Sequence, residues 1–546
     1  MRSLRPLGDW RSLFAEPCEG LFQRLHEIYG PDPLELQRRL PLWTDALEGF
    51  ARNYSPQARV FIARAPGRVN LLGMHIDHRG GAVNPLAVGD TIFVVEPRND
   101  DLVVLRNANP EFPPGEFRIR DELPAGGVED WDKWTIQEYH RRTAAGTQSD
   151  WLNYVKAGVL YLQHLNTSRG GAFSPDLKGM NVFVNGNLRP RSGLSSSSSI
   201  VMATMEACAH VNELNFSDMA LVEAAHLAEW YVGTRGGGGD HAAIKFCRHG
   251  SLAHLGAFPL TVDRIPFPDD CCAVLCDSTV VASKTAGARN LFNQRVACCE
   301  LGMLILRKSF PQHAARMKFL RDVNPAALGA DEGAIYQMLK CLPETAHRKE
   351  LSALLTDQPE ELERIYRSHE AIPGGYRIRQ ACLYGIAECL RSDRAVELLR
   401  SGDVEGFGEL IGLSHDGDRV THLVGSRRVP LAKPLPDAEL DRLAADARSA
   451  KLARREKARL YRQPGGYDAS CQELDEMVDI ALAVPGALGA GLVGAGLGGS
   501  IVVLARKDCA QAVIASMAEQ YYRPRGLPAM AQLCPGVGGS GILDVG

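Results

Sequence analysis

Several features that mark other classes of protein are missing from this chain. No long run of basic residues occurs and the formal net charge is −4, so nucleic acid is not expected as a partner. The 14 cysteines are scattered, and none lies in the Cys-x-x-Cys spacing that zinc and redox sites use. The N-terminus carries arginines but no apolar segment typical of a secretion signal. These absences predict a cytoplasmic protein with reduced thiols.

A membrane-spanning segment is also not expected. One uncharged run, residues 481–505, is long enough to cross a bilayer. Its glycines and Pro485 argue against a single helix, and its second half has the composition of a strand. The composition of the whole chain, 45% hydrophobic and 23% charged residues over 546 positions, is that of a globular protein with two or three domains.

The most informative stretch that is present joins an apolar run, a turn rich in glycine and serine, and a helix-forming segment. Residues 180–184 favour a strand, 190–194 favour a turn, and 195–214 favour a helix that begins with five serines. The start of such a helix offers unpaired N–H groups and the positive end of the helix dipole, so it can bind an anion. The turn does not end in Gly-Lys-Ser/Thr and is therefore not the eight-residue phosphate loop. These residues alone leave a second interpretation open, in which the serines only cap the helix.

A second polar cluster lies between residues 67 and 81. It contains Arg68, His75, Asp77, His78 and Arg79, with glycines at both ends. The His-x-Asp-His spacing is compatible with a metal site, but the rest of a metal signature is missing. Hydrogen bonding to a polyol is at least as natural chemically, because aspartate accepts from two adjacent hydroxyls and histidine can donate or accept.

With these residues the chain resembles the galactokinases, which belong to the GHMP family of small-molecule kinases. The resemblance rests on segments that follow in the family's order: residues 65–73 with His75, Asp77 and the glycines at 80–81, then residues 151–156, 193–198, 236–241 and 486–500. They extend from about residue 56 almost to the last residue. The ordered set is specific, although each segment alone is not.

The resemblance implies a fold of the α+β class, with two domains and the active site in the cleft between them. We expect a helical extension over residues 1–55 and an N-terminal GHMP domain that binds nucleotide and sugar over 56–262. A C-terminal GHMP domain is expected over 263–546, with a helical insertion where residues 300–460 show helical spacing of apolar residues.

The resemblance also implies the site residues. Asp240 would accept the proton of the attacking sugar hydroxyl, and Arg68 would balance the charge that develops there. The turn at residues 193–198 would hold the phosphates of ATP, and magnesium would be bound by oxygen ligands. The expected sets are Arg68 and Asp240 for catalysis; Met74, His75, Asp77 and Gly239 for the sugar; Gly193, Leu194, Ser195, Ser196, Ser197 and Ser198 for ATP; and Ser197 and Glu229 for magnesium.

The sugar-binding segment departs from the galactokinase pattern. Galactokinases place a glutamate before His-x-Asp to bind the hydroxymethyl group of galactose, and here that position is Met74, which cannot accept a useful hydrogen bond. The pattern resembles galacturonate kinases, in which a glutamate would repel the substrate carboxylate; His78 or Arg79 would then receive that carboxylate. The absence of the glutamate also suits L-arabinose, which lacks the C6 carbon of galactose. Residues 277–295 resemble the family's sugar-contacting stretch, in which residues 291–292 stand where a tyrosine is expected. Residues 239–241 replace the usual Met-Asp-Gln.

We therefore predict an ATP- and magnesium-dependent kinase that phosphorylates the C1 hydroxyl of a galactose-like sugar, with galacturonate or L-arabinose in place of galactose. A non-catalytic sensor that binds sugar and ATP and regulates a protein partner is the alternative, and a GHMP kinase acting on a non-sugar alcohol is a third hypothesis. Intact Arg68 and Asp240 favour the enzyme, while the altered sugar-binding segment keeps the sensor hypothesis open. The expected partners are sugar and ATP, without nucleic acid or membrane; the sequence predicts no oligomeric state.

Overall fold

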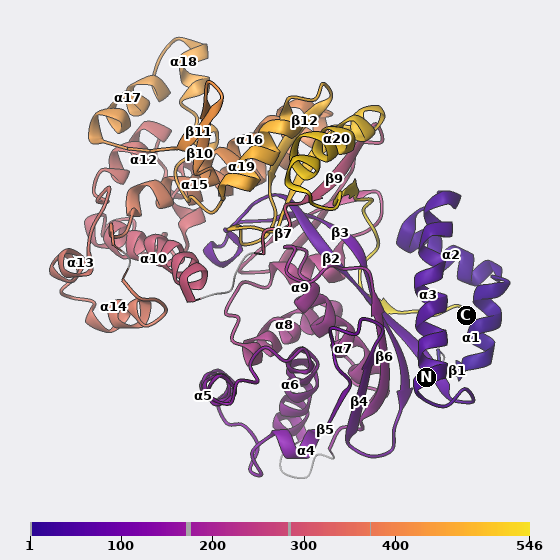
Figure 1. The fold of residues 1–546 in the computed structure, drawn as a ribbon. Helices are drawn as coiled ribbons and strands as arrows, with labels where there is room; N and C mark the ends of the chain where they lie inside the picture. The colour runs from indigo at the N-terminus through magenta and orange to yellow at the C-terminus, as the bar shows by residue number, and fades with distance from the viewer. Residues whose placement is uncertain (1–2, 171–175, 282–285, 372) are drawn as a thin grey trace.

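The computed structural model describes residues 3–170, 176–281, 286–371 and 373–546. Figure 1 shows the first half of the chain, from indigo to magenta, beside the second half, which runs from pink through orange to yellow. Each half is built on its own sheet, with helices packed against it.

The first half contains a sheet of seven strands within these described ranges. Its order is β1-β2-β3-β6-β4-β5, and β15 pairs with β2 off this path. Adjacent strands are antiparallel, apart from β4 and β6, which run parallel. The strands are β1 (Arg5–Pro6), β2 (Arg59–Leu72), β3 (Asn84–Pro97), β4 (Leu102–Asn107), β5 (Gly115–Arg118), β6 (Met180–Gly186) and β15 (Gly541–Ile542). β2 is buried from Val60 onward because both faces of the sheet are covered.

Helices cover the large sheet from two sides, with α1–α3 on one side and α6–α9 on the other in Figure 1. Gly49 of α3 lies so close to the ring of Phe183 in β6 that a Cβ would come within 2.1 Å of it. Trp10, Trp43 and Phe50 are fully buried in the same core as the strands, so α1–α3 pack as part of this half. The helices are α1 (Leu7–Ala15), α2 (Glu19–Tyr29), α3 (Pro33–Asn53), α4 (Ile119–Glu122), α5 (Trp131–Ala144), α6 (Leu152–Gly170), α7 (Ser196–Val211), α8 (Asp218–Ala228) and α9 (Gly239–Phe246). A hairpin of β7 (Ser251–Gly256) and β8 (Thr261–Pro266) follows.

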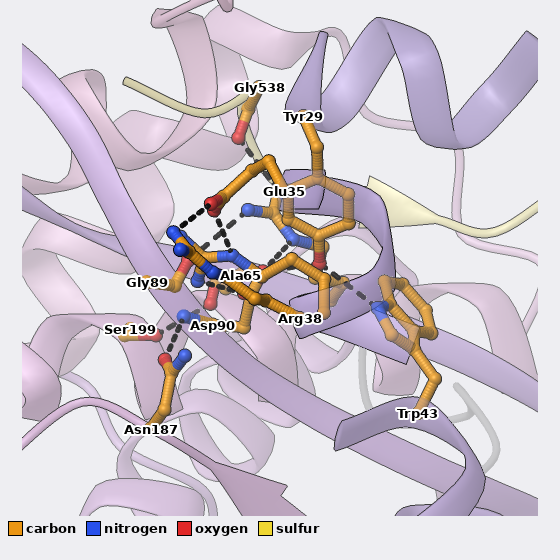
Figure 2. A network of polar contacts seen from close by, with 12 residues as sticks. Tyr29, Glu35, Arg38, Trp43, Ala65, Gly89, Asp90, Asn187, Ser199 and Gly538 are labelled. Atoms are coloured by element: carbon orange, nitrogen blue, oxygen red, sulfur yellow. Dashed lines mark hydrogen bonds and ion pairs between the residues drawn. The ribbon is translucent and has the colours of Figure 1, made fainter. Parts of the chain in front are cut away.

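A buried polar network centred on Asp90 ties the N-terminal helices to this sheet (Figure 2). Asp90 has no exposed surface and accepts hydrogen bonds from Tyr29 Oη at 2.9 Å, Arg39 at 3.1 Å and Arg64 Nε at 2.5 Å. Arg64 also donates to the carbonyl of Gly538 at 2.6 Å. A buried carboxylate is tolerated only when it is paired in this way. One cluster thus joins α2, α3, the sheet and the segment before β15.

The second half contains a four-stranded antiparallel sheet, in the part of the chain that the structure describes. Its order is β12-β13-β9-β14. The strands are β9 (Cys271–Asp277), β12 (Ala487–Leu492), β13 (Ser500–Arg506) and β14 (Ala531–Leu533), and the main helices are α10 (Ala286–Ser309), α15 (Ile378–Ser401), α16 (Val404–Asp418), α19 (Gln472–Leu482) and α20 (Ala510–Met517). The uncharged run at 481–505 is therefore the end of α19 followed by two strands. Among the described residues, no helix has both the length and the apolar character needed to cross a membrane.

Residues 300–460 are mainly helical, as their spacing predicts. They add α11 (Pro325–Leu328), α12 (Glu332–Leu339), α13 (Arg348–Leu354), α14 (Pro359–Tyr366), α17 (Asp437–Ala447), α18 (Leu452–Lys457) and the hairpin of β10 (Thr421–Val424) and β11 (Arg427–Pro430). Within this region α15 and α16 both reach the first half, because α15 contacts β2 and β8 and α16 contacts β2.

The two halves share an apolar core. Residues from both contribute to it, among them Val69, Leu72, Leu86, Phe407, Leu410 and Val502. The chain also returns to the first half near its end, where Val537 N donates to Ala87 O at 2.9 Å and β15 pairs with β2. The domain boundaries at residues 55 and 262 stay predictions.

Candidate active site

Two residues from distant parts of the chain form an ion pair at the centre of the site. β2 carries Arg68, and the first turn of α9 carries Asp240. Arg68 Nε donates to Asp240 Oδ1 at 2.8 Å and Arg68 Nη2 donates to Oδ2 at 3.0 Å. This two-point geometry fixes both side chains. The Arg68 side chain is 9% exposed and that of Asp240 is 32% exposed, so the carboxylate keeps a face open to a ligand.

The glycine-serine turn lies directly against this pair. Arg68 Nη1 donates to Gly193 O at 2.5 Å, and Arg68 N donates to Leu194 O at 3.0 Å. Ser195 precedes α7 with a left-handed backbone (φ 54°), and its hydroxyl donates to Asp240 Oδ2 at 2.5 Å. The N–H groups in the first turn of α7, which include those of Ser196 and Ser197, have no acceptor within the helix.

The same turn is also where the second half approaches. Gly193 has φ 86°, and a Cβ there would lie 2.7 Å from the carbonyl oxygen of Val493. Ser500 at the start of β13 donates to Ser192 O at 2.9 Å. Glycine at 193 is therefore required both by the left-handed backbone and by the close contact with the C-terminal glycine segment.

The oxygen atoms expected to hold magnesium lie at the start of α7. Glu229 is 7% exposed and accepts a hydrogen bond from Ser198 Oγ at 2.9 Å. His241 Nε2 lies 3.0 Å from the same carboxylate. A carboxylate beside serine hydroxyls, at the N-terminal end of a helix, is an oxygen set that suits Mg²⁺. The contact is made by Ser198, whereas the sequence pointed to Ser197, which is half-buried in the same turn.

Asp77 faces the segment that carries Asp240. Its Oδ2 lies 2.3 Å from the position that a Cβ on Gly237 would occupy and 3.3 Å from that on Gly239, so the glycines allow the close approach. His78 donates its backbone N–H to Asp77 Oδ1 at 2.9 Å. Burial would raise the pKa of Asp77, but the hydrogen bonds from His78 and the charge of Arg68 lower it to about 2. Asp77 is therefore an ionised acceptor at neutral pH.

Met74 and His75 are turned towards the second half of the chain. Met74 is 4% exposed, and its backbone N–H donates to Glu388 of α15 at 3.1 Å. His75 has a left-handed backbone (φ 60°), its Nε2 lies 3.5 Å from Asp418, and its ring lies 4.6 Å from that of Tyr467. The segment 73–81 thus has Asp77 on the side of α9 and His75 on the side of α15.

Arg79, one of the two cations considered for a substrate carboxylate, is occupied elsewhere. It is 4% exposed, donates to Tyr467 Oη at 2.9 Å and lies over the Tyr467 ring at 4.7 Å. Its guanidinium is also close to Gly385 of α15. Of the stretch at 277–295 expected to contact the sugar, residues 282–285 lie outside the described residues.

Sequence reasoning missed the contribution of α15 and α16 to this site. Glu388 of α15 and Asp418 of α16 contact segment 73–81 but come from a region that showed only helical spacing, and Tyr467, which also contacts it, comes from the irregular stretch before α19. The signal of Glu388 and Asp418 is a charged residue on the apolar face of a helix, which becomes recognisable only when the packing is known.

Matches to known families agree with this geometry. Residues 153–248 match the family model described as the GHMP kinases N terminal domain, and residues 442–523 match the GHMP kinases C terminal model. The chain belongs to the GHMP kinases, and the expected α+β fold with two domains of this family is confirmed. Residues 48–96 match a third model, the galactokinase galactose-binding signature. Within the family the chain lies on the galactokinase branch.

The most similar curated relatives include galactokinases from several organisms. That of Dictyostelium discoideum is 25% identical over 489 residues, covering 87% of each chain, and that of Chloroflexus aurantiacus is 26% identical over 488 residues, covering 89% of this chain and 93% of the relative. The Saccharomyces cerevisiae galactokinase is 32% identical over 252 residues, which cover 43% of this chain and 44% of the relative. Among solved structures, Lactococcus lactis galactokinase complexed with galactose has a TM-score of 0.60 at 21% identity, covering 91% of this chain and 98% of that one. At this identity the structural likeness concerns the fold.

Proposed function

We propose that the protein is an ATP-dependent sugar kinase that phosphorylates the anomeric hydroxyl of a galactose-like sugar. The observation that carries the proposal is the arrangement of Arg68, Asp240 and Ser195, which places an oriented carboxylate beside the start of an anion-binding helix. Phosphoryl transfer needs this combination of positioning and charge balance more than it needs covalent chemistry.

In the proposed reaction the sugar O1–H bond breaks, the bond from O1 to the γ-phosphorus forms, and the bond from that phosphorus to the bridging oxygen of ADP breaks. Asp240 takes the hydroxyl proton, or holds the hydroxyl in line while the proton leaves. Arg68 holds the Asp240 carboxylate in place through two hydrogen bonds, and it balances the negative charge that develops on O1.

The α7 N-terminus would hold the phosphates of ATP through its unpaired N–H groups and its dipole. Glu229 with a serine of the first turn, Ser197 or Ser198, would hold Mg²⁺, which when bound neutralises charge on the β- and γ-phosphates. The hydrogen bond between Ser198 and Glu229 supports this grouping of oxygen atoms.

Asp77 would hold the sugar ring. Its depressed pKa makes it an acceptor at neutral pH, and it lies against the glycine segment next to Asp240. Two adjacent hydroxyls of a galacto-configured ring can donate to one carboxylate. That contact would present O1 to Asp240.

The finer proposal concerns C6 of the sugar. Met74 gives no acceptor where galactokinases use glutamate, so the hydroxymethyl group of galactose loses its partner. Galacturonate and L-arabinose, which differ from galactose at this carbon, are the proposed substrates. Because Arg79 is already bonded to Tyr467, it does not support the uronate, and His78 is the neighbouring candidate for a carboxylate contact.

The experiment is a turnover assay with ATP, Mg²⁺ and a panel of galactose, galacturonate and L-arabinose. Asp240→Asn should lower kcat by a factor on the order of 10²–10⁴ while nucleotide affinity is kept. Asp263→Asn, which removes a carboxylate from an exposed ion pair with Arg400, is the matched control and should behave as wild type. Near-normal turnover of Asp240→Asn would contradict the catalytic assignment. Binding of sugar and ATP without turnover in the wild type would favour the non-catalytic sensor.

A further inference from the structure

A fully buried carboxylate from the second half holds the backbone of the sugar segment. Glu388 of α15 has no exposed surface, and its Oε1 accepts hydrogen bonds from Gly73 N at 2.9 Å and Met74 N at 3.1 Å. Ser414 of α16 donates to the same oxygen at 2.8 Å. The Met74 N–H that it binds belongs to the residue that replaces the galactose-binding glutamate.

The charge of Glu388 is balanced inside the protein. Arg391 Nε donates to Glu388 Oε2 at 2.7 Å, and both side chains are completely buried. Arg391 also donates to the carbonyls of Tyr461 and Gln463, at 3.0 and 2.7 Å. Removing one member of such a pair would leave the charge of the other buried without a counter-ion, which destabilises the fold.

The segment that Glu388 holds is one that needs an external anchor. Gly73 and His75 both have left-handed backbones, with φ of 88° and 60°. For His75 this conformation is unfavourable and persists only when surrounding contacts determine it. The two N–H groups bound by Glu388 are those of Gly73 and Met74, which directly precede His75.

Glu388 is the middle of three contacts spaced one helical turn apart along α15. One turn earlier, Tyr384 Oη donates to Asp418 at 3.1 Å, and Asp418 lies beside His75. One turn later, Ser392 Oγ donates to Ala82 O at 2.5 Å. Positions i, i+4 and i+8 share a helix face, so a single face of α15 holds the sugar segment at its start, near His75 and at its exit.

We propose that Glu388, with Arg391 as its counter-ion, is a positioning residue for sugar recognition. It fixes the backbone at Met74 so that Asp77 meets the sugar in register with Asp240, and it does not touch the substrate. This inference rests on the proposed function, because it assigns the sugar, and not the nucleotide, to segment 73–81.

The test compares Glu388→Gln with wild type in steady-state kinetics. Glutamine keeps the shape and one acceptor but loses the charge, so the backbone hydrogen bonds weaken. Because small displacements in a reactive geometry cost up to about 100-fold, the sugar KM should rise about 10- to 100-fold while the ATP KM stays within about twofold. Glu397→Gln, on an exposed part of the same helix, is the matched control and should leave both constants unchanged. Ser414→Ala, which removes a single donor to Glu388, should shift the sugar KM in the same direction by less.

The outcomes separate this inference from the proposed function. If the wild type is active and folded Glu388→Gln keeps its sugar KM, or loses sugar and ATP affinity equally, the positioning role is wrong and the kinase assignment stands. If Glu388→Gln does not fold, Ser414→Ala decides by the same criterion. If the wild type binds sugars without turnover, the kinase assignment fails, and weaker sugar binding by Glu388→Gln in calorimetry would still support the inference. If the wild type binds none of the sugars, both fail.

Discussion

Met74→Glu is the substitution that tests the proposed substrate most directly. Met74 is 4% exposed and its backbone N–H is bound by Glu388, so the backbone from which a substituted side chain extends is held in place. A glutamate would restore the acceptor that galactokinases direct at the hydroxymethyl group. A hydrogen bond to a charged group contributes roughly 1.5–3 kcal/mol, which corresponds to a gain of about 10- to 150-fold in kcat/KM for galactose.

The same substitution should act in the opposite direction on galacturonate. Two carboxylates about 4 Å apart repel by about 4 kcal/mol at an effective dielectric constant of about 20. This repulsion corresponds to a decrease of about three orders of magnitude in kcat/KM for galacturonate. L-Arabinose has no group at this position and should change least, so it serves as an internal control. Met74→Gln adds a neutral acceptor of similar size, so it should raise kcat/KM for galactose without lowering kcat/KM for galacturonate.

The assay is kcat/KM for the three sugars with wild type and both variants, with thermal unfolding measured in parallel because a buried carboxylate also destabilises the fold. A wild type that already prefers galactose by about tenfold, about 1.4 kcal/mol of transition-state discrimination, would refute the argument from Met74. So would a Met74→Glu variant that shifts all three sugars equally.

Two further predictions concern magnesium and pH. The ATP KM of Ser197→Ala and of Ser198→Ala should be measured at several magnesium concentrations. Replacing the serine that ligates the metal should weaken the use of magnesium-ATP more than the use of sugar. If both variants have the ATP kinetics of the wild type, the metal ligand lies elsewhere. The folded-state pKa of Asp77 is about 2, below its ordinary 3.8, so the stabilisation from its ionised form is complete above about pH 4 and is lost as the pH falls towards 2. Urea denaturation at pH 5, 4 and 3 should show the stability difference between wild type and Asp77→Asn narrowing with acid, and a constant difference would contradict the assignment.

The sequence was sufficient for the parts of the site that depend on local chain geometry. The glycine-serine turn at 193–198, the strand before it and the helix after it follow from composition and spacing, and the structure places this turn, Arg68 and Asp240 together. The roles of these residues in catalysis stay predictions until the variants are assayed.

The parts that could not be predicted depend on packing. Successive residues on a helix point about 100° apart, so a run of serines does not reveal that Ser198 is the one on Glu229. In the same way, Glu388 lies within an ordinary helical pattern, and its contact with Gly73 joins positions 315 residues apart. No local spacing signals such a contact, because it arises when two halves of the chain close on each other.

The pairing of β15 with β2 also has a consequence for how this protein is made. Arg64 and Gly538, which lie 474 positions apart, are bonded inside the first half. During synthesis on the ribosome the first half therefore emerges long before the residues that complete its sheet. Until residues 537–543 arrive, the edge of β2 that they cover and the guanidinium of Arg64 lack these partners, and an exposed strand edge can pair with another chain. Newly made protein should consequently depend on chaperone protection for almost the whole of translation, and a ribosome-bound chain halted before residue 537 should be more sensitive to protease than the released protein.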